Sequence, residues 1–467
     1  ECAAGNWPQW RGPNRDNISS DTGLLREWPE GGPPLVWRLH GLGDGVAPVT
    51  IGGGRIFSTS LYETTEYVRA LNEKTGEPLW SAVLGPAIAQ SPLMRWLSQR
   101  SPTLDGERLY AMTMLGELVC FQADDGRELW RKHYEVDFDG ERALFGYADC
   151  PLVEGEKLIC RPGGPTASVV ALDKTTGTVL WKCGVKNAGQ AMYSNGILTT
   201  IGGRRQFVTA LQTTLVGISV DDGSVLWHHD CPEGKSNQRH THTPFVRDGV
   251  VTILDRSARG ILQLVVTRNN EEFFVKEVYA QAAGLLSRFQ DDTVFLDNRF
   301  YEMTSGVFSC FDLKTGVTIW QNRMPSAAPN GVAFTYADSK FYFHGDDGRL
   351  QLVAAGLTGP VVASEFVLPD HQLSPGATRP IVTGGRLYIR EDDQLFCFDV
   401  RENAAIQRSV PRTIELDRPT SLANNGETSA EMKTRTLRSV FVPTPQDIVE
   451  KMLELTAVKK TDVVFDL

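Results

Sequence analysis

The chain has 467 residues, of which 41% are hydrophobic and 22% are charged, and its formal net charge is −10. This composition is typical of a soluble globular protein, and the acidic balance argues against nucleic acid or an anionic membrane surface as the main partner. No apolar run approaches the roughly 18 residues that a membrane-spanning helix requires, so we expect a protein that is not transmembrane.

The chain begins at Glu1-Cys2 with no visible signal peptide. Removal of a targeting segment would leave such a start, and Cys2 would then be a candidate for a lipid anchor. Residues 1–34 come before the first strand pattern and are assigned to an N-terminal extension. Leu35–Leu39 reads as a single strand that belongs to no neighbouring hairpin.

One sequence phrase recurs along the chain, and each copy has the form of a β-hairpin. Two apolar strands flank a turn that begins with Asp, Asn, Gln or Ser and ends with Gly, and a Trp follows in the second strand. The glycine accepts the positive φ of the turn, and the flat indole ring is suited to docking on a neighbouring unit. The five copies carry these residues at Gly76 and Trp80, Gly126 and Trp130, Gly177 and Trp181, Gly223 and Trp227, and Gly316 and Trp320.

The spacing of the copies predicts a series of similar units. Neighbouring tryptophans are 46 to 51 residues apart, but Trp320 follows Trp227 by 93 residues, so a degenerate copy is expected at 261–279. A further hairpin precedes each copy, which gives four strands per unit, as in the blades of a propeller. Eight units begin near residues 47, 101, 149, 194, 242, 287, 331 and 377.

The predicted fold is therefore an all-β, eight-bladed β-propeller with four-stranded antiparallel blades, covering residues 35–400. No segment in this range has a helical period. The eighth unit lacks a closing Trp strand, and the strand around Trp37 is expected to supply it. Joining strands from both ends of the chain would leave the ring without an open edge between its first and last blades.

The repeated phrase resembles the tryptophan-docking repeat of pyrroloquinoline-quinone-type propellers. The opening Trp7-Pro-Gln-Trp10-Arg-Gly-Pro-Asn14 also looks like the start of bacterial exported propellers of this family. The resemblance covers about residues 6–400. It implies structural docking on the next blade by six tryptophans, namely Trp37, Trp80, Trp130, Trp181, Trp227 and Trp320.

The eight cysteines include no C-x-x-C pair and no adjacent pair, so no zinc site is expected. Three of them share one position of the repeat, where other copies have Ala70 and Ala171, and are predicted to be small buried residues. These are Cys120, Cys310 and Cys397. Cys150 and Cys160 flank a tight turn, so they either form a disulfide across a hairpin or remain separate thiols.

The C-terminal residues have a different character from the repeats. Residues 401–440 contain no aromatic side chain and are assigned to a linker. Residues 441–467 read as a helix with a capping box at Thr444 followed by a short strand. This tail resembles the start of a class I S-adenosylmethionine-dependent methyltransferase, truncated before any glycine loop, so no such activity is expected. The alternative is an ordinary terminal helix and strand packed on the propeller.

Binding residues are expected on the loops that join the outer strand of one blade to the inner strand of the next, because these loops gather at one mouth of the central channel. His240 and His242 are two residues apart on an extended segment and could face the same way. The alternative is a polar loop whose imidazoles bond to neighbours, and two ligands alone do not make a metal site. The candidate ligand-binding residues are Gln90, Tyr147, Gln190, Tyr193, Arg239, His240, His242, Asn330 and His371.

No catalytic constellation remains once the blades are assigned. We therefore predict a non-catalytic binding or scaffold propeller, periplasmic or in a bacterial cell envelope, that is a monomer and takes a protein or small molecule at the channel mouth. In repeat type it resembles the propeller lipoprotein of outer-membrane β-barrel assembly. One alternative is a quinone-dependent dehydrogenase, but the adjacent cysteines and the Glu, Asn and Asp set that hold quinone and calcium there are missing, so no cofactor is expected. The other alternative is a recognition domain of a propeller–methyltransferase fusion.

Overall fold

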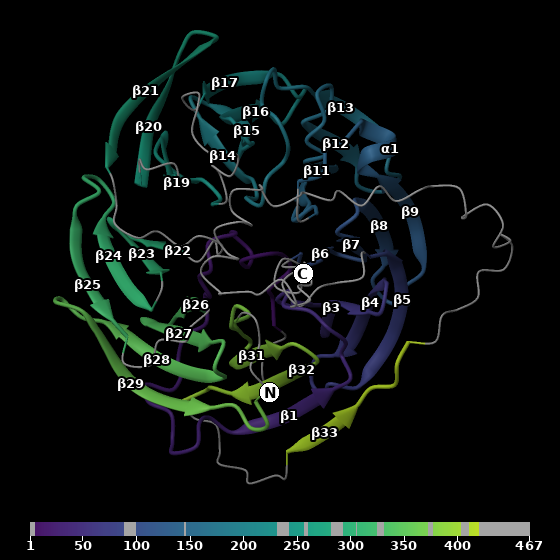
Figure 1. The fold of residues 1–467 in the computed structure, drawn as a ribbon, viewed down its shortest axis with the longest axis vertical. Coiled ribbons are helices and arrows are strands. Elements are labelled where there is room, and N and C mark those ends of the chain that lie inside the picture. Colours follow the sequence, from purple (N-terminus) through teal and green to yellow (C-terminus); the bar gives the residue numbers. More distant parts are fainter. Residues whose placement is uncertain are drawn as a thin grey trace, which may run out of the picture. The chain divides into compact units, whose positions relative to one another are not determined.

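The computed structural model describes residues 5–87, 100–143, 146–230, 242–255, 260–281, 293–304, 306–324, 331–371, 377–402 and 411–419. Within these ranges the chain forms eight β-sheets, built mainly from antiparallel strands, that follow one another around a ring (Figure 1). Seven sheets have four strands in sequence order and the eighth has five. The predicted all-β, eight-bladed propeller is confirmed.

We name the blades A to H in chain order, and within each the first strand lies innermost (Figure 1). Blades A to D comprise β2 (Thr50–Gly52), β3 (Arg55–Tyr62), β4 (Thr65–Asn72), β5 (Pro78–Pro86); β6 (Thr103–Asp105), β7 (Arg108–Met112), β8 (Glu117–Gln122), β9 (Glu128–His133); β10 (Leu152–Glu154), β11 (Lys157–Cys160), β12 (Val169–Asp173), β13 (Val179–Cys183); and β14 (Ile197–Ile201), β15 (Arg204–Ala210), β16 (Thr214–Ser219), β17 (Val225–Asp230). Blades E to G comprise β18 (Phe245–Arg247), β19 (Val250–Asp255), β20 (Gly260–Asn269), β21 (Glu272–Gln281); β22 (Thr293–Leu296), β23 (Arg299–Thr304), β24 (Val307–Asp312), β25 (Thr318–Arg323); and β26 (Val332–Ala337), β27 (Lys340–Gly345), β28 (Arg349–Ala355), β29 (Pro360–Val367). The helix α1 (Tyr134–Phe138) is a single turn between blades B and C, too short to show a period in the sequence.

Blade H closes the ring with strands from both ends of the chain. Its order is β30 (Ile381–Thr383), β31 (Arg386–Glu391), β32 (Gln394–Asp399), β1 (Leu35–His40) and β33 (Arg412–Glu415). Trp37 of β1 lies opposite Cys397 of β32, as the predicted closure requires. β33 then pairs in parallel with β1, so the segment that we assigned to a linker contains a short strand.

Four consecutive seams between blades are held by the same contact between an indole ring and a glycine. The ring of one outer strand covers the turn glycine of the next blade so closely that a Cβ atom there would lie only 2.5–2.9 Å from ring atoms. Each of these glycines also has a φ of +72° to +76°, which disfavours any side chain. The pairs are Trp37 with Gly76, Trp80 with Gly126, Trp130 with Gly177, and Trp181 with Gly223.

The residue opposite each of these tryptophans, on the neighbouring strand of the same blade, is small. Ala70, Cys120 and Ala171 lie directly across from Trp80, Trp130 and Trp181, and Cys310 and Cys397 lie across from Trp320 and Trp37. A β-bulge follows this pair in every one of these blades, which turns the indole toward the next blade. The prediction that the cysteines of this position are small buried residues is confirmed.

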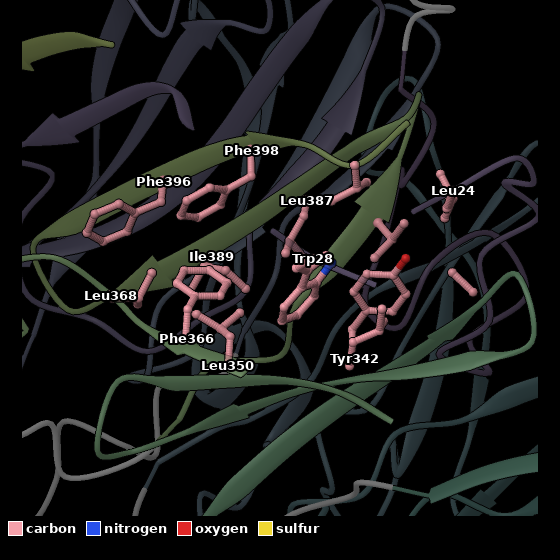
Figure 2. Packing of buried hydrophobic residues seen from close by; sticks show 14 residues of the cluster. Leu24, Trp28, Tyr342, Leu350, Phe366, Leu368, Leu387, Ile389, Phe396 and Phe398 are labelled. Atoms are coloured by element: carbon pink, nitrogen blue, oxygen red, sulfur yellow. The ribbon is translucent and has the colours of Figure 1, made fainter. Parts of the chain in front are cut away.

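Blade G has no tryptophan at this position, and the N-terminal extension supplies one. Ser364 stands where the Trp would be, and its hydroxyl oxygen accepts a hydrogen bond of 2.9 Å from the backbone N–H of Trp28. The Trp28 ring packs against Tyr342 and Phe366 of blade G, with ring centroids 5.9 and 5.3 Å away. Figure 2 shows this ring between blade G and the apolar side chains of β31 and β32, including Leu387, so it joins the last two blades.

Cys150 and Cys160 are separate, buried thiols in the structure, which decides between the two alternatives left by the sequence. The hairpin register pairs Leu152 with Ile159, so Cys160 extends the pairing opposite Pro151 and not opposite Cys150. Burial raises the pKa of Cys150 to about 11, so its thiol is protonated at neutral pH.

Replacing Gly126 by Ala should destabilise the protein more than the same change at Gly106. Both positions have positive φ, which costs about 1 kcal/mol for a residue with a Cβ atom, but only at Gly126 would that atom meet the Trp80 ring, at 2.5 Å. The added crowding should cost about 1–3 kcal/mol more. Urea denaturation of both variants measures the difference, and equal midpoints would contradict the importance of the docking contact.

The Trp28→Ala variant should lose about 3–5 kcal/mol of stability, because it empties a buried site between blades G and H. Thermal or urea unfolding of the full chain measures the loss. Val361→Ala is a matched control on the same blade, because Val361 is 58% exposed and its truncation should change stability by less than about 0.5 kcal/mol. Similar midpoints for the two variants would show that the N-terminal ring does not hold the seam.

Candidate binding site at the channel mouth

The structure places five of the nine predicted ligand-binding residues on the loops between blades. Tyr147 lies on the loop before blade C, Gln190 and Tyr193 before blade D, His242 before blade E, and His371 before blade H. The remaining candidates, namely Gln90, Arg239, His240 and Asn330, lie outside the described residues, so the paired-histidine hypothesis for 240 and 242 stays a prediction.

Tyr147 and His242 are buried. The Tyr147 ring meets the edge of Tyr134 with centroids 5.2 Å apart, and its carbonyl oxygen accepts a hydrogen bond of 3.1 Å from Arg100. Gln190 donates from its side-chain amide to the carbonyl oxygen of Arg142 at 3.2 Å, so it ties two neighbouring loops together. These contacts hold the loops in place and do not present the side chains to a ligand.

His371 belongs to a buried group that joins blades G and H. Its Nδ1 lies 2.6 Å from a carboxylate oxygen of Glu391, and Nε2 of His344 lies 3.9 Å from the same oxygen. Nδ1 of His344 lies 2.9 Å from the carbonyl oxygen of Thr378, which fixes that nitrogen as the donor. The contact of His371 with Glu391 fixes the loop before blade H, and the bond of His344 to Thr378 links blade G to the same loop.

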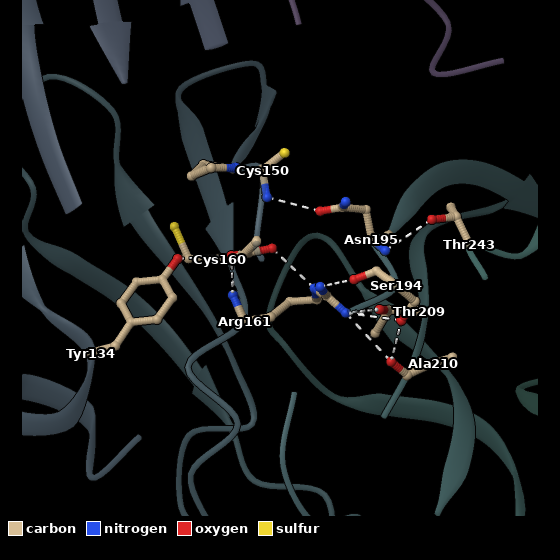
Figure 3. Close-up of polar contacts among 12 residues, drawn as sticks. Tyr134, Cys150, Cys160, Arg161, Ser194, Asn195, Thr209, Ala210 and Thr243 are labelled. Carbon is tan, nitrogen blue, oxygen red and sulfur yellow. Dashed lines mark hydrogen bonds and ion pairs between the residues drawn. The ribbon is translucent and has the colours of Figure 1, made fainter. Parts of the chain in front are cut away.

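A larger polar network lies at the seam between blades C and D (Figure 3). Arg161 is fully buried and donates to Asp149 at 3.0 Å, to the hydroxyl of Thr209 at 3.2 Å and to the backbone carbonyl of Ser194. Asp149 also accepts from the Tyr134 hydroxyl at 2.8 Å. Burial raises the pKa of Tyr134 well above its ordinary value, so the phenol keeps the proton that it donates. The buried ion pair is thus satisfied from several sides.

The same position of the repeat carries a buried basic side chain in three blades. These residues are Arg161, His344 and Arg390, and each lies in the second strand of its blade or directly after it. Each bonds to a backbone carbonyl of the loop that leads into the next blade, three residues before the inner strand of that blade begins. The carbonyls belong to Ser194 for Arg161, to Thr378 for His344 and to Ala47 for Arg390. Arg390 also donates to the Ser58 hydroxyl at 2.7 Å. Burial lowers the pKa of Arg390 to about 10, which leaves it charged at neutral pH. These side chains hold seams together, as the indole rings do farther out.

The centre of the ring contains the N-terminal segment of the chain. Residues 7–17 bond in turn to inner strands or their flanking loops in blades A, B, C, D, F and G, and the partners are Ile51, Leu104, Pro151, Gly196, Thr293 and Tyr336. Trp10 is buried beneath the guanidinium groups of Arg11, Arg15 and Arg379, each within 5.2–5.9 Å of its ring. The segment therefore crosses the central channel from one side to the other.

A pocket of about 400 Å³ lies beside this segment, along the inner strands of blades C to F. One wall is apolar and includes Phe245 stacked on Phe295, with ring centroids 3.9 Å apart. Among the charged residues of the lining, Arg205 bonds to Glu154 at 2.6 Å, and Arg15 bonds to the backbone carbonyls of Pro151 and Gly196. Its volume suits a small ligand, but its charges offer no group of free carboxylates.

The described residues do not fit a quinone with a calcium ion. A calcium ion needs several oxygen ligands around it, and the quinone with its calcium ion needs space at the axis of the ring. In this chain residues 7–17 occupy that space. Within the described part of the chain, no group of three or more His, Cys, Asp or Glu side chains is placed to hold a metal ion.

The sequence analysis did not single out Arg161, Asp149, Arg390 or Arg15 as residues of the channel region. A signal was present for two of them, because Arg161 and Arg390 fall at equivalent positions of otherwise apolar second strands. Asp149 and Arg15 lie in loops outside the repeated phrase, so no periodic pattern marked them, and the partners of Arg15 are also distant in the chain.

Three comparisons with known proteins agree on the type of propeller. A family model described as outer membrane protein assembly factor BamB matches residues 64–322. The outer membrane protein assembly factor BamB of Shewanella oneidensis is 23% identical over 313 residues, which cover 62% of this chain and 75% of that protein.

Among solved structures, BamB from Moraxella catarrhalis aligns with a TM-score of 0.52 and 14% identity, covering 79% of this chain and 98% of that one. The quinohemoprotein alcohol dehydrogenase from Comamonas testosteroni aligns with a TM-score of 0.61 and 14% identity, covering 86% of this chain and 81% of that one. At such identities the alignments show a shared fold alone.

Replacing Arg161 by Met should cost about 3–5 kcal/mol, because it leaves the Asp149 carboxylate buried without its cation. Arg55→Met is the control, since Arg55 forms a surface ion pair with Asp124 at 2.9 Å and such pairs contribute less than about 1 kcal/mol. Urea denaturation measures both changes. A loss as small for Arg161→Met as for Arg55→Met would mean that the network does not stabilise the seam.

Proposed function

Since the chain belongs to the PQQ-like β-propeller repeat family described as outer membrane protein assembly factor BamB, we propose that it is a non-catalytic scaffold of the bacterial cell envelope. In this role it binds other proteins during the assembly of the outer membrane. The proposal also places the protein in the periplasm, attached to or near the envelope. None of the helices in the described part of the chain is long and apolar enough to cross a membrane.

The observation that carries the proposal is the N-terminal segment in the central channel. Residues 7–17 bond to six of the eight blades from inside the ring, so the chain uses its axis for its own stability. Enzymes and small-molecule binders usually keep a concave site open for their ligand. A ring filled at its centre leaves its two faces and its rim for contacts with larger partners.

A quinone-dependent dehydrogenase is the main competing function, because the fold is shared with a quinohemoprotein alcohol dehydrogenase. Fold alone does not carry activity, and the described residues do not fit the cofactor pair. The methyltransferase-fusion alternative depends on residues 441–467, which lie outside the described residues. None of the matches given above is to a methyltransferase, so we do not favour this alternative.

The channel-mouth loops are the part of the faces that we propose for partner binding. The loops before blades C and D are joined by the hydrogen bond from Gln190 to Arg142, and the clasp of His371 with Glu391 fixes the loop before blade H. A set of loops fixed by a rigid ring presents a defined surface, which lowers the entropic cost of binding a protein.

Two measurements on the full chain test the proposal. Titration with pyrroloquinoline quinone and Ca²⁺ should give no saturable change in absorbance. Cross-linking in cells of the source bacterium, followed by mass spectrometry, should recover outer-membrane proteins or components that assemble them. Stoichiometric quinone binding, or cross-links to none of these proteins, would contradict it.

A pair of variants locates the binding surface. Replacing residues 237–241 by Gly and Ser, with the buried His242 retained, should reduce the cross-linked yield if the channel mouth is used. A matched replacement of the exposed residues Leu357 and Thr358 in the β28–β29 turn should leave the yield unchanged. Equal yields from the two variants would remove the channel-mouth assignment while leaving the scaffold role intact.

A further inference from the structure

Blade E differs from the other blades in its outer hairpin. β20 and β21 have ten residues each, and they are joined by the tight turn Asn270-Glu271 without the docking phrase of the other blades. Figure 1 shows this hairpin reaching beyond the ring at the upper left of the view. β21 is the edge of its sheet, so one side of its backbone faces away from the propeller.

The two faces of β21 have different surroundings. Phe273 and Val275 pack against the apolar cluster between blades D and E. The opposite face carries Phe274, which is 51% exposed, and the exposed Lys276, and Val278, which is 49% exposed, follows at a β-bulge. A long edge strand with an exposed apolar face is prone to pair with another strand.

The hairpin register determines which backbone groups of β21 are directed outward. Asn269 pairs with Glu272 across the two-residue turn, and such a closing pair exchanges both of its hydrogen bonds within the hairpin. The groups then alternate along the strand, so the N–H and C=O of Phe273 and Val275 point away from β20. These residues can pair with a further strand.

We propose that β21 pairs antiparallel with β21 of a second copy of this chain, about a two-fold axis at Phe274. In this register each Phe273 exchanges backbone hydrogen bonds with Val275 of the partner subunit, and the two Phe274 rings lie side by side. Each Lys276 then faces Glu272 of the partner subunit, so the exposed face has two opposite-charge pairs flanking an aromatic pair. Such pairs are the units that stabilise antiparallel sheets.

Charge selects this register over its neighbours. Centring the axis on Lys276 would set two lysines face to face, which destabilises a pair of strands. Centring it on Val275 would place Lys276 opposite Phe274 and leave Glu272 opposite the apolar Val278. The register at Phe274 satisfies both the apolar and the charged residues, and it uses the same patch on both copies, as a closed two-fold dimer requires.

The contact involves the rim of one blade and leaves both faces of the ring open. It therefore does not depend on the proposed scaffold role and is compatible with it. It is an alternative to the sequence-based expectation of a monomer, which stays a prediction until the oligomeric state is measured.

Sedimentation equilibrium of the full chain over a range of concentrations tests the dimer. The wild-type chain should show a reversible, concentration-dependent dimer. Lys276→Glu and Glu272→Lys should each weaken it by roughly 10-fold or more, because both cross-strand pairs become repulsive. The double variant, which exchanges the two charges, should restore association to near the wild-type level.

Two further variants serve as controls. Arg323→Glu changes a charge on the exposed outer strand of blade F and should leave the dimer unaffected, whereas Phe274→Ala should weaken it. All these positions are exposed, so melting temperatures should remain near that of the wild-type chain, which separates loss of pairing from loss of folding. A wild-type chain that stays monomeric throughout, or a double variant as weak as the single ones, would overturn the proposal.

Discussion

The contact between an indole ring and a turn glycine of the next blade is the constraint on which the ring depends. The indole is large and flat, so it can bridge two sheets only where the residue opposite it is small and the residue beneath it has no Cβ atom. This explains why Ala, Cys and Gly share one position and why the turn glycine is retained from blade to blade. Blades A, B and C each take part in two such contacts, one through the turn glycine and one through the tryptophan, so each depends on both of its neighbours.

The seams without this contact show how the protein replaces it. Between blades G and H, Trp28 arrives from outside the repeat and occupies the site above Ser364. The seams between blades C and D and between H and A have the indole contact, and there Arg161 and Arg390 add buried cations that bond to the backbone of the following blade. The outer hairpin of blade E has neither an inserted tryptophan nor a buried cation of this kind, and it extends past the ring.

The repeated elements could be predicted from the sequence, and the unrepeated ones could not. The position of Trp37 opposite Cys397 followed from counting units and noting that the last lacked a strand. The path of residues 7–17 through the channel left no periodic trace, because its contacts join residues that are far apart in the chain. Burial of Arg15 and Arg161 also runs against the usual exposure of arginine. For the same reason loop residues such as Tyr147 read as ligand candidates, although their partners lie in neighbouring loops.

Ring closure by β1 has a consequence for how the chain folds. The strand that completes the last blade, β1, is synthesised before the rest of the ring, and its partner β32 comes some 360 residues later. Until then, the edge of β1 that pairs with β32 has no partner, and pairings at such separation form slowly. A nascent or freshly exported chain must therefore keep this edge of β1 unpaired until β32 is available, a state in which an open strand edge is prone to aggregate.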